Sequence, residues 1–135
     1  MSNQFLTNPN SNGISFGNVP EMNSRGIIIP EGEIRLGVGK HRGPNRGWGA
    51  QHIWAEHRTE MAANGFLTYN DVPGYVALIV KIGTRLYFGN DHMRETRVMA
   101  VNSSAGTAIL EYKERRDAPI WSIVTAYSGV RTHGT

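Results

Sequence analysis

The chain has 135 residues, 39% of them hydrophobic, a length and composition that suit one domain with a single buried core. Its formal net charge of +3 favours a polyanionic partner only weakly, because such charges are common among soluble proteins. The absence of cysteine excludes a disulfide framework, a thiolate nucleophile and a cysteine-based zinc site.

The chain begins with an asparagine-rich segment, residues 1–25, which we expect to be a flexible lead-in to one α+β domain over residues 26–135. Its composition, with glycine and proline among the asparagines, is typical of irregular structure. It lacks the features of a secretion signal, and no later apolar run approaches about 18 residues, so we expect no membrane span. Short β-type runs follow at 26–30 and 33–39.

A basic, glycine-rich loop over residues 40–49 leads into a helix predicted from Trp48 to Asn64. At 100° per residue, one face of this helix is an apolar stripe with His57 at its middle, formed by Ile53, Trp54 and Met61. His52 lies about 140° from His57, beside Glu56, on the border of the buried surface. The helix therefore offers one imidazole inward and one at an edge.

The start of this helix is a candidate anion site. The first N–H groups of a helix are unpaired and its dipole is positive there, which favours a phosphate. A Gly-Trp-Gly sequence, Gly47 to Gly49, brings backbone close to that point, and the preceding loop supplies Lys40, His41, Arg42 and Arg46. The alternative is that His57 is an ordinary core histidine and the basic loop is merely solvated.

The helix is predicted to end at Asn64-Gly65, and strands are predicted for the rest of the chain. The run from Tyr75 to Ile82 is apolar on both faces except at Lys81, which indicates a central strand. Further strands are predicted at 85–88, 96–101, 107–113 and 120–127, and their short connections predict an antiparallel meander. We expect the helix to pack on a four-stranded or larger antiparallel sheet and to help bury Ile53, Trp54, Met61, Val76, Leu78, Val80, Ile109 and Ile123.

The last predicted strand carries two hydroxyl groups. Alternation places four residues on one face, namely Trp121, Ile123, Thr125 and Tyr127. Thr125 and Tyr127 then present their hydroxyls side by side. The alternative is that both residues are there as good β-formers.

These stretches resemble the barnase–EndoU–colicin–RelE-like (BECR) ribonucleases, and in particular their phage-associated branch. The matching residues are Gly47 to Ile53, followed by His57, and Val124 to Tyr127 near the end, and the resemblance covers roughly residues 36–128. It implies an N-terminal helical segment packed on an antiparallel sheet. It also implies a metal-independent, cofactor-free RNA endonuclease of toxin type, acting in the cytoplasm of a host or target bacterial cell. The implied partners are RNA, with transfer RNA as one candidate, and an inhibitory immunity or antitoxin protein.

The resemblance also implies site residues. His52 matches the catalytic histidine of the Gly-aromatic-x-His motif, and Thr125 with Tyr127 match the Ser/Thr and Tyr of the final strand. A second histidine and a lysine usually complete such a site, and His57, His41 and Lys40 compete for those roles.

RNA cleavage without metal needs a general base for the 2′-hydroxyl, a general acid for the 5′-oxygen and donors for the charged phosphorane. We assign His52 as base or acid and His57 as its partner or orienter, with Thr125 and Tyr127 bonding the phosphate. The products would carry 2′,3′-cyclic phosphate and 5′-hydroxyl ends. His52 and Thr125 should lie within about 10 Å of each other on one open surface. The candidate substrate-binding residues are Lys40, Arg46, Trp48, Arg94, Arg97, Lys113 and Arg115.

Three other classes of protein compete with this hypothesis. A zinc protease needs HExxH, and His52 and His57 are separated by one residue too many, so we expect no metal site. A non-catalytic nucleic-acid-binding module would use the same basic residues, with Trp48, Trp54 or Tyr127 as stacking platforms. A phage structural or interaction protein would need only the packing.

Overall fold

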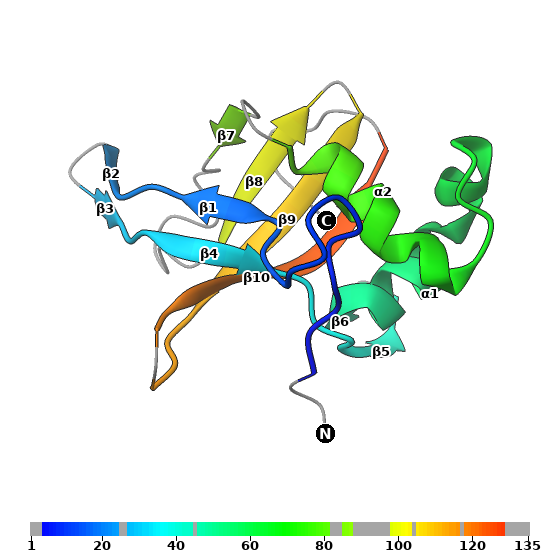
Figure 1. Cartoon of the computed structure of the whole chain (residues 1–135), viewed down its shortest axis with the longest axis horizontal. Helices are drawn as coiled ribbons and strands as arrows, with labels where there is room; N and C mark the ends of the chain where they lie inside the picture. The colour runs from blue at the N-terminus through cyan, green and yellow to red at the C-terminus, as the bar shows by residue number, and fades with distance from the viewer. Residues whose placement is uncertain are drawn as a thin grey trace.

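The computed structural model describes residues 4–24, 27–44, 46–81, 85–87, 98–103, 105–116 and 118–128. Within these ranges the fold is α+β, with two α-helices beside a six-stranded sheet (Figure 1). The predicted α+β class is therefore confirmed. The sheet is mixed, however, and the prediction of a purely antiparallel sheet is wrong, because β4 and β10 run parallel.

The sheet has the strand order β1-β4-β10-β9-β8-β7. Its bounds in that order are β1 Gly17–Val19, β4 Gly32–Arg35, β10 Ile120–Tyr127, β9 Gly106–Lys113, β8 Val98–Ser103 and β7 Arg85–Tyr87. The β7–β8, β8–β9 and β9–β10 pairs are antiparallel, as the predicted meander requires. Two small hairpins complete the described strands, β2 Met22–Ser24 with β3 Ile27–Ile29 and β5 Lys40–Gly43 with β6 Arg46–Trp48.

The asparagine-rich segment contributes to the core, although its composition predicted irregular structure. Phe16 is 3% exposed and Val19 is fully buried, and β1 pairs with β4 at the edge of the sheet. Further back, the Leu6 amide donates to the Leu36 carbonyl at 2.8 Å. Two apolar side chains spaced three residues apart were thus enough to anchor a segment that is otherwise polar.

Helix α1, Gly49–Ala63, confirms the predicted helix within one residue at each end. Contrary to what the resemblance implied, the helix is not N-terminal, because β1 to β6 precede it. Its N-cap, Trp48, makes no side-chain cap. Instead the amides of Ala50 and Gln51 donate to the carbonyls of Gly37 and Val38, both at 2.9 Å. These bonds occupy two of the N–H groups that we expected to hold an anion, so the candidate anion site at the helix start is not supported.

The C-terminal end of α1 follows the prediction closely. Gly65 has a φ of +90°, and the Phe66 amide donates to the Met61 carbonyl at 2.8 Å, which closes the last turn. Glycine is required here because its left-handed conformation is costly for other residues. The predicted αL stop is confirmed.

The two histidines of α1 exchange the environments predicted for them. His52 is only 4% exposed, whereas the His57 side chain is 16% exposed. The helix departs from helical geometry at His57, with φ −130° and ψ 16°, which breaks the 100° periodicity on which the prediction depends. The β5–β6 hairpin also packs against α1 and covers His52. Ile53 and Met61 are buried as predicted, and Trp54 is partly buried.

A second helix, α2 Val72–Ile79, stands where a central strand was predicted, so that prediction is wrong. A short apolar run does not distinguish a buried helix from a buried strand. The local signals favoured a helix: Pro73 lies in its first turn, and the preceding 3-10 helix Tyr69–Asp71 carries a capping box between Thr68 and Asp71. Val76 and Val80 are buried, but Leu78 is 41% exposed because it faces outward from the helix.

Strand β10 contains a bulge that changes which residues share a face. Ile123 pairs with Leu110, and Thr125 pairs with Ile109, the next residue of β9. Since neighbouring residues of β9 point to opposite faces, Thr125 lies on the face opposite Ile123, contrary to the predicted alternation. Thr125 and Tyr127 still share a face, and Ile109 and Ile123 are buried as predicted.

The contact between residues 37–39 and the start of α1 gives a stability prediction. Gly39 has a φ of +72°, and a Cβ placed there would lie 1.9 Å from the Trp48 carbonyl oxygen. Gly39→Ala should therefore lower the free energy of unfolding by at least about 1–3 kcal/mol. Gly13→Ala is the matched control, since a Cβ at Gly13 meets only Ser11, at 3.8 Å. Urea unfolding that gives equal losses for the two variants would contradict this account.

Candidate active site

Two histidines and a carboxylate meet where the β5–β6 hairpin covers α1. His41, from β5, places its Nδ1 3.1 Å from the Nδ1 of His52, and the two rings are stacked with centroids 5.3 Å apart. Glu56 lies one helical turn after His52, and its Oε2 is 3.9 Å from the Nε2 of His41. We call His41, His52 and Glu56 the imidazole cluster.

Gly47 makes the imidazole cluster possible. Its φ is +140°, and a Cβ there would lie 2.9 Å from the His52 Nδ1 and 2.3 Å from the Lys40 carbonyl oxygen. Only a residue without a side chain lets β6 pass this close to the imidazole. The first glycine of the Gly-Trp-Gly sequence is thus required by local sterics. The side chain that requires it is His52, the histidine that the family resemblance implies as catalytic.

Burial sets the charge state of His52. Desolvation lowers the pKa of His52 below its ordinary value of 6.5, because the charged imidazolium loses water. The Glu56 carboxylate opposes this effect, whereas His41 and His57 lower the pKa of His52 further. His52 is therefore a neutral imidazole near pH 7, the form that accepts a proton.

His57 lies one and a half turns further along α1 and contacts the end of β10. Its Nδ1 is 2.9 Å from the Glu60 Oε2, and its ring centroid is 5.5 Å from that of Tyr127. The other carboxylate oxygen of Glu60 accepts a hydrogen bond of 2.8 Å from the Ser128 amide. Glu60 therefore holds both the His57 ring and the backbone of Ser128, the residue that directly follows β10.

Thr125 and Tyr127 lie on the same face of β10 as expected, but both are buried. Thr125 is 6% exposed and Tyr127 is 1% exposed. Among the residues that the structure describes, the Thr125 Oγ1 has no hydrogen-bond partner. A buried hydroxyl without a partner costs about 1–3 kcal/mol, so its presence calls for an explanation such as a bound ligand group.

The structure thus brings together several predicted residues. His57 contacts Tyr127, and His52 is close enough to His57 for their charges to interact. The prediction that His52 and Thr125 lie on an open surface is wrong, because both are buried. The distance of about 10 Å expected between them stays a prediction.

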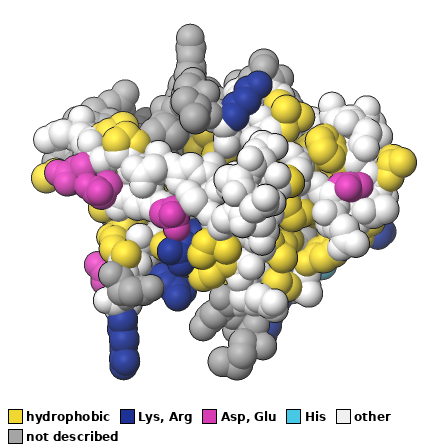
Figure 2. All heavy atoms as spheres, viewed as in Figure 1, with side chains coloured by type: hydrophobic (Ala, Val, Ile, Leu, Met, Phe, Trp, Pro, Cys, Tyr) yellow, Lys and Arg dark blue, Asp and Glu magenta, His cyan; other side chains and the backbone are white. Residues whose placement is uncertain are grey.

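The predicted basic residues within the described ranges lie in two separate places, the β5–β6 hairpin and the end of β9. Lys40 and Arg46 are exposed on the β5–β6 hairpin, and Arg94 and Arg97 lie outside the described residues. Lys113 pairs with Ile120, the first residue of β10. Tyr127, the last residue of β10, is roughly 20 Å from Ile120 along the extended strand. On the face drawn in Figure 2, lysine and arginine side chains form separate spots rather than one continuous surface.

Trp48, Lys113 and Arg115 nevertheless share a cavity of about 210 Å³. Phe5 also lines it, and the Arg115 guanidinium lies 5.2 Å from the centre of the Phe5 ring. The Lys113 Nζ is 3.2 Å from the Glu111 carboxylate, so its charge is partly balanced. This arrangement combines aromatic faces with positive charge, which is the chemistry that suits a nucleotide.

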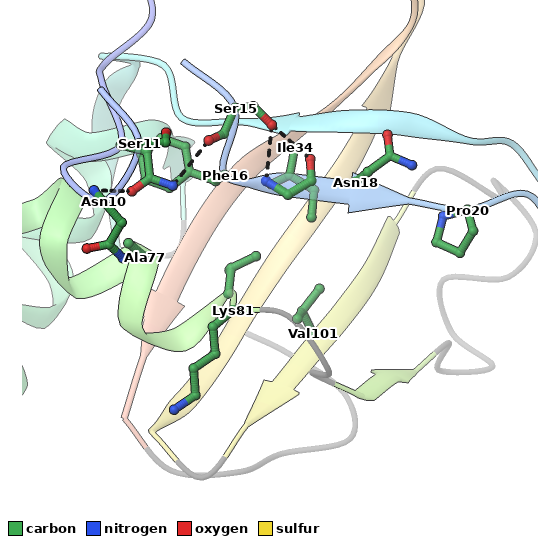
Figure 3. A pocket seen from close by; sticks show the side chains of 13 residues that line it. Asn10, Ser11, Ser15, Phe16, Asn18, Pro20, Ile34, Ala77, Lys81 and Val101 are labelled. Carbon is green, nitrogen blue, oxygen red and sulfur yellow. Dashed lines mark hydrogen bonds between the residues drawn. The ribbon is translucent and has the colours of Figure 1, made fainter. Parts of the chain in front are cut away.

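A second cavity, of about 930 Å³, lies between the N-terminal loop, β1, α2 and β8 (Figure 3). Polar side chains such as Asn10, Ser11 and Asn18 line it together with the apolar Phe16 and Val101. Neither the imidazole cluster nor any other predicted site residue within the described ranges lines it. It is therefore separate from the candidate active site.

Sequence reasoning missed the carboxylates and the backbone that hold the histidines. Glu56 was seen beside His52 but not as part of a site, although the spacing of four residues placed both on one helical face. Glu60 has the same kind of signal, three residues after His57. The role of Ser128 has no local signal, because it depends on how β10 ends against α1.

The chain has no significant match among protein-family models, curated proteins or solved structures. Among the described residues, no helix is both long and apolar enough to cross a membrane.

The buried hydroxyl of Thr125 predicts opposite effects of two substitutions on stability. Thr125→Val keeps the shape and removes the unpartnered hydroxyl, so it should raise the free energy of unfolding by about 1 kcal/mol. Thr125→Ser keeps the hydroxyl and removes a buried methyl group, so it should lower that free energy by about 1 kcal/mol. Chemical denaturation gives the free energies of unfolding of both variants and of wild type. If Thr125→Val is less stable than wild type, this hydroxyl has a partner in the free protein.

Proposed function

We propose that the protein is a metal-independent endoribonuclease whose proton transfers are made by His52 and His57. One observation carries this proposal: each histidine holds its Nδ1 against a protein group, His41 for His52 and Glu60 for His57. Both rings are thereby oriented, and in the proposed mechanism their Nε2 atoms meet the substrate. A pair of oriented imidazoles is the arrangement that acid–base cleavage of RNA needs.

The reaction is a transesterification within the RNA. The neutral His52 accepts the proton of the 2′-hydroxyl, the 2′-oxygen forms a bond to phosphorus, and the bond from phosphorus to the 5′-oxygen breaks. His57 gives a proton to the departing 5′-oxygen. The products are a 2′,3′-cyclic phosphate and a 5′-hydroxyl, and the base and acid are restored by exchange of one proton with water.

Other residues of the site have supporting roles in this mechanism. The Thr125 hydroxyl, which lacks a partner among the described residues, supplies a hydrogen bond to a phosphate oxygen, with Tyr127 beside it. His41 and Glu60 are positioning residues, since they act through His52 and His57. The cavity of Trp48, Lys113 and Arg115 binds a nucleotide further along the RNA strand.

The BECR resemblance of the sequence supports the same reaction and suggests its setting. The protein would act as a toxin on cytoplasmic RNA of a host or target bacterial cell, with transfer RNA as a candidate substrate. An immunity or antitoxin protein would restrain it.

A non-catalytic nucleic-acid-binding module is the second candidate. The observation that favours it is the cavity where Trp48 and Phe5 meet Lys113 and Arg115. Such a module would bind RNA with unchanged affinity after His52 and His57 are replaced.

The proposed mechanism predicts RNA cleavage in excess EDTA, with no cleavage of DNA, which lacks the attacking 2′-hydroxyl. His52→Ala and His57→Ala should each slow cleavage by about 10²–10⁴-fold, the usual contribution of a general acid or base. Thr125→Val should slow it by roughly 10–100-fold, since one hydrogen bond to a charged group contributes about 1.5–3 kcal/mol. Gel analysis of labelled RNA and identification of the product ends measure these effects.

Gln51→Ala is the matched control for these variants, because Gln51 is exposed on the same helix and contacts neither histidine through a described interaction. It should cleave at the wild-type rate, and thermal melting should show that all variants are folded. Activity that needs added metal, or wild-type rates in His52→Ala, would refute the mechanism. Binding without cleavage would favour the second candidate.

The cavity that Arg115 lines predicts a separate effect on RNA binding. Arg115→Ala should weaken binding to single-stranded RNA and reduce the slope of log affinity against log salt by about 0.7, the share of one phosphate contact. The cleavage rate at saturating RNA should change little. Arg115 follows the end of β9, which pairs with the first residue of β10, whereas Tyr127 is the last residue of β10. Fluorescence anisotropy at several salt concentrations measures the slope, and Arg116→Ala, on the exposed neighbour, is the control.

A further inference from the structure

The imidazole cluster has a chemistry that the proposed cleavage does not use. One ring nitrogen of His41, one of His52 and a carboxylate oxygen of Glu56 all lie within 4.8 Å of one another. The closest pair of atoms is the two Nδ1 atoms, at 3.1 Å. Two imidazoles and a carboxylate form a ligand set that zinc binds readily.

The geometry of the imidazole cluster suits a tetrahedral ion. Zinc–nitrogen bonds of about 2.0–2.1 Å place two nitrogen ligands roughly 3.3 Å apart, close to the separation of the two Nδ1 atoms. The carboxylate of Glu56 lies within 4.8 Å of the imidazole ligand atoms. Its side chain is 21% exposed, which leaves it room to move towards the ion.

The ligands come from two elements that pack on each other. His52 and Glu56 are one turn apart on α1, and His41 belongs to a hairpin that is packed on the same helix. A preformed set of ligands loses less conformational entropy on binding than ligands on loops. His57 and Glu60, the other histidine–carboxylate pair of α1, have no third ligand among the described residues.

We propose that His41, His52 and Glu56 form a binding site for Zn²⁺, with a fourth position open to water or a phosphate oxygen. Structural zinc sites have four protein ligands, so a site with three protein ligands and one open position is not of the structural type. Mg²⁺ is not expected to bind, because it prefers oxygen ligands.

Zinc at this site has a consequence that rests on the proposed ribonuclease function. A metal on the His52 Nδ1 uses the lone pair of that nitrogen and leaves the ring proton on Nε2. His52 then has no nitrogen that accepts the proton of the 2′-hydroxyl. Zinc therefore inhibits the cleavage, and removal of zinc by EDTA restores it.

The binding itself is tested without RNA, by isothermal titration of the purified protein with Zn²⁺ after removal of bound metal. Wild type should bind one ion in the cluster. His41→Ala and Glu56→Gln should each weaken that binding by at least about 10-fold, since even the loss of a group that only supports a ligand costs about 10–100-fold. Both residues are partly exposed, so the substitutions leave the core intact, and His57→Ala should bind zinc as wild type does.

The outcomes separate this proposal from the proposed function. Equal zinc affinity in wild type, His41→Ala and Glu56→Gln, or no binding by wild type, would overturn the zinc site whatever the activity on RNA. Cobalt(II) in place of zinc gives a second measurement, because tetrahedral coordination produces a visible absorption that Glu56→Gln should lose. Zinc binding by a protein that fails to cleave RNA would refute the ribonuclease function alone.

Discussion

The backbone contact between residues 37–39 and the start of α1 determines where the histidines lie. The first amides of α1 donate to the carbonyls of Gly37 and Val38, and this direct capping leaves no room for side chains at Gly39 and Gly49. The β5–β6 hairpin directly precedes the helix, and its β5 strand places His41 against His52. The glycines of both segments are therefore a steric requirement of the candidate site as well as of the fold.

The candidate site is built from polar groups that are costly to bury. His52 is nearly fully buried and its pKa is lowered, and Thr125 keeps a buried hydroxyl without a partner among the described residues. A chain selected only for stability would replace such groups with apolar ones of the same shape. Their presence in one site is the physical reason to expect chemistry here.

The sequence predicted the elements whose local signals agree and failed where tertiary contacts decide. Helix α1 and its Gly65 stop follow from periodicity and from a left-handed glycine, and β8 to β10 follow from alternation and turns. The helix α2 was taken for a strand because its apolar run has no period, and a one-residue bulge moved Thr125 to the other face. His41 and Ser128 joined the site through pairing between distant segments, which no local pattern records.

The central claim is that His52 and His57 converge on one phosphate of an RNA strand. The most direct test is a side-chain NMR titration with a 2′-O-methylated RNA oligonucleotide, which binds but lacks the attacking hydroxyl. The imidazole signals of both His52 and His57 should shift together at the same oligonucleotide concentration, because one phosphate contacts both rings. Backbone signals that report binding near Trp48 while neither imidazole responds would contradict the claim.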